Sequence, residues 1–286
     1  MRLATWNVNS LRARLDRVLA WLAQARPDVL LMQETKLADA AAPHLAFEAA
    51  GYELAHHGEG RWNGVAIASR VGLLGIRAGF EGAGPDATGA RMLAARCGGV
   101  QVVSLYAPNG RAVDSEFYVA KLDWFARLRA WLDGSADPHD DLVLGGDLNV
   151  APEDVDVWSP AAFEGATHVT APEREAYRRL LDWGLVDAYR QHHPEPGRYT
   201  WWDYRAGAFH KGEGMRIDHL LVSRSVAARC SSAEIDREAR KGTLPSDHAP
   251  VWIDLDDRPG AALDAASAVE AAGEPAGGAR EAPPAA

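Results

Sequence analysis

The stretch Leu142-Val143-Leu144-Gly145-Gly146-Asp147-Leu148-Asn149 joins the pattern of a buried strand to two polar side chains. Its first part is a short apolar run of the length typical of a buried strand. Asp147 and Asn149 follow two residues apart, so both would point to the same side if the extended geometry continued. That placement would put a proton acceptor and an amide around one phosphate group. The alternative is an ordinary turn, because Gly, Asp and Asn are typical turn residues.

Four more segments repeat this arrangement of an apolar run that leads to or from polar side chains. They are Trp6-Asn7-Val8-Asn9, Gln33-Glu34-Thr35-Lys36, Arg216-Ile217-Asp218 and Ser246-Asp247-His248-Ala249-Pro250. Strands that end in carboxylates or amides bring polar groups to one rim of a sheet, where they can surround a hard cation beside a proton-transfer group. Such a set suits the hydrolysis of a phosphodiester with Mg²⁺ or Mn²⁺.

Each segment also has a plain structural interpretation. Glu34 could be an exposed strand end paired to a nearby lysine, although an acid at the end of a buried strand is costly unless it is paired or bound to metal. Asn7 and Asn9 could be simple loop residues, Asp218 a surface carboxylate and His248 a core or capping histidine. A carboxylate bonded to one nitrogen of His248 would instead fix its tautomer and make the other nitrogen more basic. Five such segments together favour the functional interpretation.

Aromatic residues form a second signal. The segment Tyr199-Thr200-Trp201-Trp202-Asp203-Tyr204-Arg205 combines several rings with an arginine, which suits stacking on a sugar or base and neutralising a phosphate. Core packing is the alternative, and we expect it for at least one of the two tryptophans. The segment Tyr106-Ala107-Pro108-Asn109-Gly110 predicts a tight loop, in which Tyr106 either donates to a phosphate oxygen or is a plain turn residue.

The composition allows a sizeable core, since 47% of the 286 residues are hydrophobic. The net charge is −10, of which residues 257–286 contribute −3 and the remainder −7. Proteins that bind nucleic acid are usually basic, so this charge argues mildly against such a partner. The argument is weak for a metal enzyme, because cations neutralise clustered acids and local basic patches matter more than the total.

Several features predict a cytoplasmic protein without a membrane partner. The two cysteines, Cys97 and Cys230, match no metal or redox motif and are expected to stay reduced. The N-terminal residues are typical of a strand rather than a secretion signal, and no apolar run approaches the length that spans a membrane.

The hydrophobic periodicity predicts alternating strands and helices in two halves. Helices are expected after a cap at Ser10, over residues 118–132, and after the capping box Thr170-x-x-Glu173. Strands are expected at the N-terminus and over residues 28–32, 65–68, 92–95, 100–105, 142–145, 217–222 and 251–255, with a hairpin turn at Gly98-Gly99. Residues 1–256 are predicted to form one catalytic domain. Residues 257–286, rich in Ala, Gly, Pro and Glu, are predicted to be a disordered tail.

In these segments the chain resembles the exonuclease III family of abasic-site endonucleases, within the endonuclease/exonuclease/phosphatase superfamily. Further matching segments, in family order, are Tyr106-Ala107-Pro108-Asn109-Gly110, Trp183-Gly184-Leu185-Val186-Asp187 and Trp201-Trp202-Asp203-Tyr204-Arg205. The resemblance implies an α/β fold of the DNase I type, a four-layer αββα sandwich of two mixed sheets with helices outside. It implies a DNA repair nuclease that acts on duplex DNA, trims nucleotides or blocking groups from 3′ ends and incises 5′ of abasic sites. We expect it to act as a monomer.

The resemblance also implies roles for individual residues. Those expected to take part in catalysis are Tyr106, Asp147, Asn149, Asp218 and His248. Those expected near a Mg²⁺ or Mn²⁺ ion are Asn7, Glu34, Asp147, Asn149, Asp247 and His248. Those expected to contact the substrate are Asn109, Trp201, Arg205 and Ile217. Within this scheme Asp147 orients or deprotonates the attacking water, and the Asp218–His248 pair polarises the phosphate.

Two alternatives remain beside this interpretation. A phosphoinositide or sphingomyelin phosphodiesterase would use the same core residues, but the aromatic segment 201–205 and the missing signal peptide favour DNA. A non-catalytic nucleic-acid-binding protein is disfavoured by the complete set of acidic residues and His248. The stretch between Pro152 and Pro172 is shorter than in the best-known bacterial member. The sequence therefore leaves open the balance between exonuclease and abasic-site activity.

Overall fold

The computed structural model describes residues 1–80 and 89–256. Within this part the strands form two six-stranded mixed sheets and one short two-stranded ribbon. The first sheet has the order β13 (Cys230–Ile235), β14 (Val251–Leu255), β1 (Arg2–Asn7), β2 (Val29–Gln33), β4 (Val65–Ser69) and β3 (Glu53–His57). The second has the order β5 (Leu74–Ala78), β6 (Met92–Cys97), β7 (Val100–Tyr106), β8 (Leu142–Asp147), β12 (Asp218–Ser223) and β9 (Leu185–Asp187). The ribbon pairs β10 (Trp201–Trp202) with β11 (Gly214–Met215).

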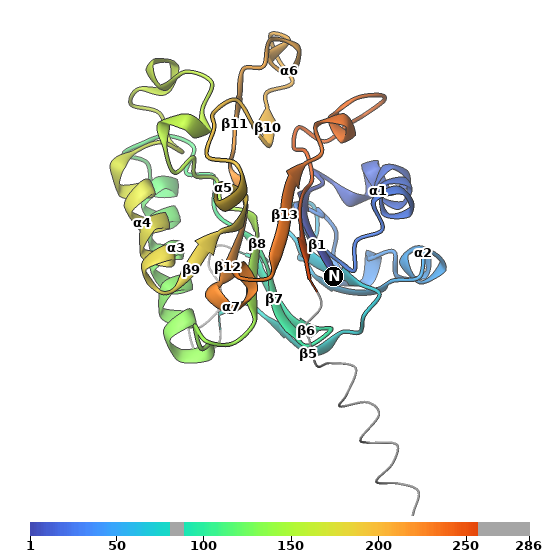
Figure 1. Ribbon diagram of the computed structural model, residues 1–286. Coiled ribbons are helices and arrows are strands. Elements are labelled where there is room, and N and C mark those ends of the chain that lie inside the picture. Colours follow the sequence, from blue (N-terminus) through green and yellow to red (C-terminus); the bar gives the residue numbers. More distant parts are fainter. Residues whose placement is uncertain (81–88, 257–286) are drawn as a thin grey trace, which may run out of the picture. The chain divides into compact units, whose positions relative to one another are not determined.

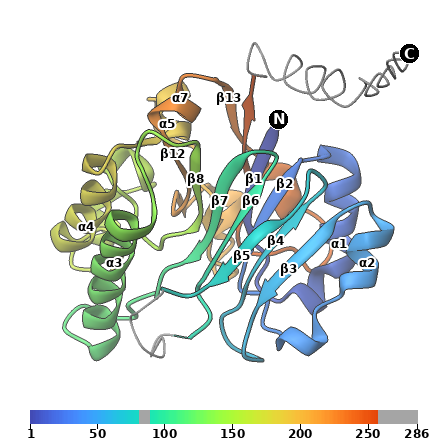
Figure 2. The same cartoon turned by 90° about the horizontal axis from the view of Figure 1, so that it is seen from below.

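Helices cover the outer faces of both sheets (Figures 1 and 2). Beside the first sheet lie α1 (Leu11–Ala25) and α2 (His44–Ala49), and beside the second lie α3 (Glu116–Ser135) and α4 (Ala171–Asp182). The shorter helices are α5 (Ala188–His192), α6 (Ala208–Lys211) and α7 (Arg224–Ala227). Single 3₁₀ turns span Asp39–Ala41, Asp154–Asp156, Pro160–Phe163 and Arg237–Arg240. The predicted four-layer αββα sandwich is confirmed.

Three hydrophobic clusters explain the layering. One contains residues of both sheets, such as Leu31 of β2 and Val143 of β8, and fills the space between them. A second joins the outer face of the second sheet to α3 and α4, and a third joins the outer face of the first sheet to α1. A sheet that is buried on both faces needs apolar residues on every side, which is why the central strands read as continuous apolar runs.

The predicted elements agree with the structure, with small shifts at their ends. Ser10 caps α1, and Thr170 with Glu173 forms the predicted capping box of α4. Gly98 and Gly99 both have positive φ at the hairpin between β6 and β7, as a type I′ turn requires. Strand β8 is longer than expected and ends at Asp147. The sequence pattern missed β3, β5, β9 and β13, which are the edge strands of the two six-stranded sheets and bury fewer side chains. It also missed β10 and β11, the two short strands of the ribbon.

Residues Met1–Leu255 form one compact unit. The predicted disordered tail, residues 257–286, lies outside the described residues, so the domain boundary at 256 stays a prediction. No helix in the described part of the chain is long and apolar enough to cross a membrane.

The two glycines of β8 differ in what surrounds them, and this difference can be tested. A Cβ on Gly146 would lie 1.8 Å from the main-chain oxygen of Leu105 in β7, whereas one on Gly145 would meet the ends of the Leu31 and Leu220 side chains. Side-chain ends can move, and such overpacking typically costs about 1–3 kcal/mol. We therefore expect Gly146→Ala to lower the free energy of unfolding by more than Gly145→Ala, measured by urea denaturation. Equal losses would contradict this explanation.

Candidate active site

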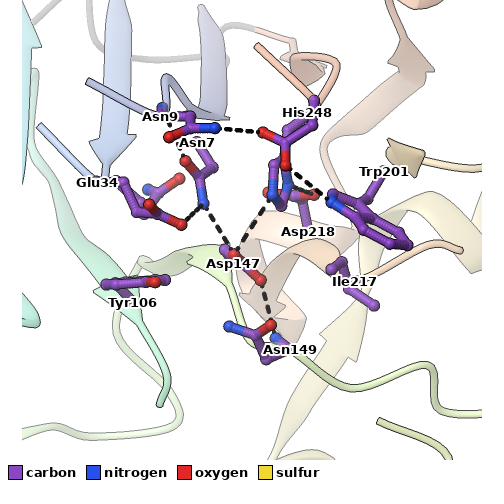
Figure 3. Close-up of polar contacts among 12 residues, drawn as sticks. Asn7, Asn9, Glu34, Tyr106, Asp147, Asn149, Trp201, Ile217, Asp218 and His248 are labelled. Carbon is purple, nitrogen blue, oxygen red and sulfur yellow. Dashed lines mark hydrogen bonds and ion pairs between the residues drawn. The ribbon is translucent and has the colours of Figure 1, made fainter. Parts of the chain in front are cut away.

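Most of the predicted site residues lie at one rim of the sandwich, where strands of both sheets end (Figure 3). In the first sheet, parallel pairing places Asn7 of β1 beside Gln33 of β2, so Glu34 follows directly at the rim. In the second sheet, Asp147 of β8 lies opposite Tyr106 of β7 and Asp218 of β12. Strand pairing therefore delivers side chains that are distant in the sequence to one place.

Three of these side chains form a cluster that could hold a cation. One ligand atom each from Glu34, Asp147 and His248 lie within 4.8 Å of one another. Asn7 holds the two acids together, because its Nδ2 donates to Glu34 Oε1 and to Asp147 Oδ2, each at 2.9 Å. Carboxylate oxygens are the donors that Mg²⁺ and Mn²⁺ prefer, so the residues present fit such an ion.

Glu34 is paired to Lys36, as one interpretation of the sequence proposed, but it is partly buried and is not the exposed strand end of that interpretation. Its Oε2 lies 2.8 Å from Lys36 Nζ, and it still belongs to the acidic cluster. Burial opposes its ionisation, but the charge of Lys36 and the bond from Asn7 prevail and lower the pKa of Glu34. The backbone of Glu34 has a φ of 51°, a conformation that non-glycine residues rarely adopt. The side chain is thus held ionised, in a strained turn, beside the acidic cluster.

Asp218 and His248 form the predicted carboxylate–imidazole pair. His248 Nδ1 lies 2.8 Å from Asp218 Oδ2, and both side chains are almost fully buried. His248 Nε2 lies 3.8 Å from Asp147 Oδ2. Burial disfavours the charged imidazole, but Asp218 and Asp147 outweigh it and raise the pKa of His248 to about 10. His248 is therefore a cation at neutral pH, aimed at the centre of the site, and in this state it has no lone pair for a metal ion, which leaves Glu34 and Asp147 as the ligands of the cluster.

The pKa of Asp147 lies well above the usual value for an aspartate. Burial raises the pKa of Asp147 to about 7, although the nearby His248 lowers it and Asp218 raises it further. Its other neighbours at hydrogen-bond distance are donors from Asn7 and from the main-chain nitrogen of Asn149. A carboxylate with a pKa near the working pH is suited to accept a proton in catalysis.

The extended geometry that would put Asp147 and Asn149 on one side does not continue past β8. Asn149 has a φ of 52°, so the chain turns there. Asn149 N instead donates to Asp147 Oδ1 at 2.9 Å, which brings the two residues together by a different route. The side-chain oxygen of Asn149 accepts from Asn109 Nδ2 at 3.2 Å and lies 3.0 Å from His168 Nε2. Because that oxygen already has these partners, Asn149 is placed to act as a donor.

An ion-pair network fixes the start of β12 and with it Asp218. Arg216 is buried and bonds Asp156 at 2.6 Å and Asp187 at 2.8 Å. Arg190 also pairs with Asp156. The charge of Arg216 and its hydrogen bond lower the pKa of Asp156 although burial opposes this. Replacing one partner of such a network would leave an uncompensated buried charge.

The other predicted residues are placed less uniformly. Tyr106 and Asn109 line a pocket of about 700 Å³ that opens beside Glu34. Asp247 lies outside the three-residue cluster, since its oxygens accept from Asn9 Nδ2 and Trp201 Nε1. Trp201 is half-buried at the rim, whereas Trp202 is a core residue, so the expectation that at least one tryptophan is buried is confirmed.

Two of the predicted substrate contacts are not brought into the cluster. Ile217 is only 2% exposed and packs with Ala151, Val157 and Met215. Arg205 is exposed and its guanidinium pairs with Asp203. Their roles toward a substrate stay predictions.

Sequence reasoning missed three buried residues, Lys121, His168 and Glu173, whose hydrogen bonds hold the loops of the site in place. Glu173 was recognised only as half of a capping box. Lys121 had a detectable signal, because it occupies the apolar stripe of a helix where a charged residue is unexpected. His168 follows no regular element and gave no signal.

The αββα fold and a rim that fits a divalent cation are features of metal-dependent phosphodiesterases. The chain belongs to the endonuclease/exonuclease/phosphatase family, whose sequence model matches residues 4–248. It is 34% identical to exodeoxyribonuclease III of Haemophilus influenzae, over 89% of this chain and the whole of that protein. It is 32% identical to an exodeoxyribonuclease of Bacillus subtilis, over 88% of this chain and 98% of that protein.

Solved structures of DNA-processing enzymes also match this chain. A 3′ phosphatase from Neisseria bound to a product DNA hairpin is 41% identical, with a TM-score of 0.87, covering 90% of this chain and all of the other. An AP endonuclease from Archaeoglobus fulgidus is 38% identical, with the same TM-score and coverage. The predicted membership of the exonuclease III family is confirmed, and the chain is a nuclease-type hydrolase of that family. Enzymes of this family depend on a divalent metal, and the acidic cluster fits one.

The pKa of Asp147 predicts how its replacement changes stability with pH. The folded-state pKa of about 7 lies above about 3.9 in an unfolded chain, so the folded protein keeps a proton that the unfolded chain has released. This contribution stabilises the fold at low pH and is lost as pH rises through 7. Asp147→Asn has no such loss. We expect the melting temperature of the metal-free variant, relative to wild type, to increase between pH 5 and pH 8. A difference independent of pH would refute the raised pKa.

The cluster predicts a metal defect when Glu34 is changed. Glu34→Gln keeps the size and the hydrogen bond from Asn7 but removes one negative charge near the ion. We expect a higher Mg²⁺ concentration for half-maximal activity, with much of the rate recovered at saturating metal. Asp254→Asn, at the far end of β14, removes one carboxylate away from the rim and serves as the control. An unchanged Mg²⁺ requirement in Glu34→Gln would exclude Glu34 as a ligand.

Proposed function

We propose that this protein is a Mg²⁺- or Mn²⁺-dependent DNA repair nuclease of the exonuclease III type. It removes nucleotides or blocking groups from 3′ ends of duplex DNA and incises 5′ of abasic sites. The observation that carries the proposal is the cluster of Glu34, Asp147 and His248 at one rim, with the donor Asn149 beside it. The printed names of the relatives, which include exodeoxyribonuclease III, a 3′ phosphatase and an AP endonuclease, support DNA as substrate.

The side chains would divide the work as follows. Glu34, with Asp147 within reach, would hold the ion, which supplies charge stabilisation at the phosphate and the leaving 3′-oxygen. Asp147 would accept the proton of the attacking water, for which its raised pKa is suited. The cationic His248, fixed by Asp218, would stabilise the charge that develops on the phosphate.

Two neutral donors would complete the phosphate site. Burial and the nearby Glu34 hold the pKa of Tyr106 well above its usual range, so its hydroxyl stays protonated and can donate to a phosphate oxygen. The remaining amide hydrogen of Asn149 would do the same, since its other one is bonded to the main-chain oxygen of Ala107. Asn109 lines the adjoining pocket and would contact the DNA strand that carries this phosphate.

We also propose that the protein works as a monomer in the cytoplasm. The compact unit carries all the residues of the cluster in one chain. Cys97 and Cys230 are both buried and match no metal or redox motif, which suits a reducing compartment.

The decisive test compares substrates side by side. We expect the purified protein, with Mg²⁺ or Mn²⁺, to trim a 3′-recessed duplex, release phosphate from a 3′-phosphorylated end and nick a duplex carrying one abasic site. A phosphoinositide should not be hydrolysed, and a chelator should abolish the activity. Failure to cleave any of the DNA substrates with either metal would refute the proposal, and hydrolysis of the phosphoinositide alone would favour a lipid phosphodiesterase.

A matched variant excludes a contaminating nuclease. Asp147→Asn keeps the size of the side chain and removes the proposed proton acceptor, a loss that typically lowers a rate by about 10²–10⁴-fold. A variant that kept more than about a tenth of wild-type turnover would show that Asp147 does not act on the water.

A further inference from the structure

A lysine lies on the buried face of α3. Residues of this helix that face the core include Tyr118, Trp124, Phe125 and Leu128, and Lys121 lies among them with no exposed surface. Removing an ammonium group from water is costly unless it is paired and hydrogen-bonded. A leucine or methionine at this position would fill the core without that cost, so the charge requires an explanation.

The partner of Lys121 is Glu173, at the first turn of α4. Lys121 Nζ lies 2.5 Å from Glu173 Oε1, and neither side chain is exposed. The same oxygen accepts from Thr167 Oγ1 at 2.6 Å and from His168 N at 2.9 Å. The other oxygen accepts from the main chain and hydroxyl of Thr170. Glu173 thus fixes the whole segment that leads into α4.

Lys121 also reaches the two loops that carry the proposed phosphate donors. Its Nζ donates to the main-chain oxygen of Asn149 at 2.6 Å and lies 3.4 Å from that of Asn109. Three segments are therefore joined at one ammonium group: the loop after β7, the loop after β8 and residues 167–170. These segments also supply the groups that bond the side chain of Asn149, namely Asn109 Nδ2, His168 Nε2 and the main-chain oxygen of Ala107.

We propose that the buried Lys121–Glu173 pair is a positioning device that orients the amide of Asn149 toward the phosphate. This inference rests on the proposed function of Asn149 as a phosphate donor. Buried ion pairs are weak evidence for stability, because apolar residues of the same volume often stabilise as well or better. The geometry points to a different benefit: a rigid support that holds two loops and the α4 entry segment at a fixed distance from Asp147. Neither Lys121 nor Glu173 touches the substrate in this arrangement.

The test is a double-mutant cycle between Lys121→Met and Asn149→Ala. We expect Lys121→Met to lower kcat by roughly 10²-fold, as misplacement of a reacting group by about 1 Å does. The Mg²⁺ concentration for half-maximal activity should not change, because Lys121 makes no contact with Glu34. In the Asn149→Ala background, Lys121→Met should cause no further loss of kcat, since the group that it positions is gone. Additive losses would overturn the inference.

Two controls separate positioning from general destabilisation. Leu132→Ala creates a cavity on the same helix, roughly 16 Å further along its axis, and should lower the melting temperature while kcat is retained below the transition. The double variant Lys121→Met/Glu173→Gln removes both buried charges, so it should recover stability relative to Lys121→Met. It should still show the low kcat, and recovery of kcat together with stability would overturn the inference.

The result for Asn149→Ala alone distinguishes a failure of the proposed function from a failure of the positioning inference. If Asn149→Ala alone kept wild-type kcat, its proposed role as a phosphate donor would fail, and the positioning inference would fail with it. If Asn149→Ala lowered kcat but Lys121→Met did not, the proposed function would stand and only the positioning inference would be wrong.

Discussion

The amide of Asn7 connects the two halves of this molecule at the point where the site forms. It donates to Glu34, which follows β2 of the first sheet, and to Asp147, which ends β8 of the second. Two carboxylates repel each other, and a donor shared between them lowers the cost of their approach. Because β1 and β8 belong to different sheets, this contact ties the two edges together at the site. The distances between the acidic cluster, the Asp218–His248 pair and the loop at Asn149 all depend on how far apart these two sheet edges lie.

Around this contact the environment divides similar groups into different charge states. Lys36 keeps the pKa of Glu34 low, whereas burial raises that of Asp147 to about 7. Asp218 and Asp147 together raise the pKa of His248 to about 10. One rim thus offers an ionised acid for a cation, an acid that can exchange a proton, and a fixed positive charge. Neighbouring groups whose pKa values are pushed apart in this way are typical of sites that combine binding with proton transfer.

The accuracy with which strands were predicted from the sequence depended on how fully each strand is buried. Central strands such as β2, β4 and β8 are buried on both faces, so their apolar runs were visible without any structure. Four of the strands that went unrecognised, β3, β5, β9 and β13, lie at the edges of the six-stranded sheets, where few side chains are covered and the pattern is weak. The other two, β10 and β11, have only two residues each, too few to show a pattern. Lys121 was missed for a different reason, since it is fully buried. A periodicity argument treats a lysine as solvent-exposed, and nothing local shows that Glu173 lies beside it.

The sequence by itself determined the family, the residue types of the site and their positions at strand ends, because strand signals are local and the polar residues follow them directly. It also determined the capping box of α4 and the hairpin at Gly98-Gly99, which depend on neighbouring residues alone. Only the tertiary structure decided which groups meet. The turn at Asn149, the separation of Asp247 from the acidic cluster and the burial of Ile217 all result from packing between segments far apart in the chain. Charge states and donor directions depend on distances of a few ångströms, and those are set by the way two sheets pack rather than by the order of residues along either one.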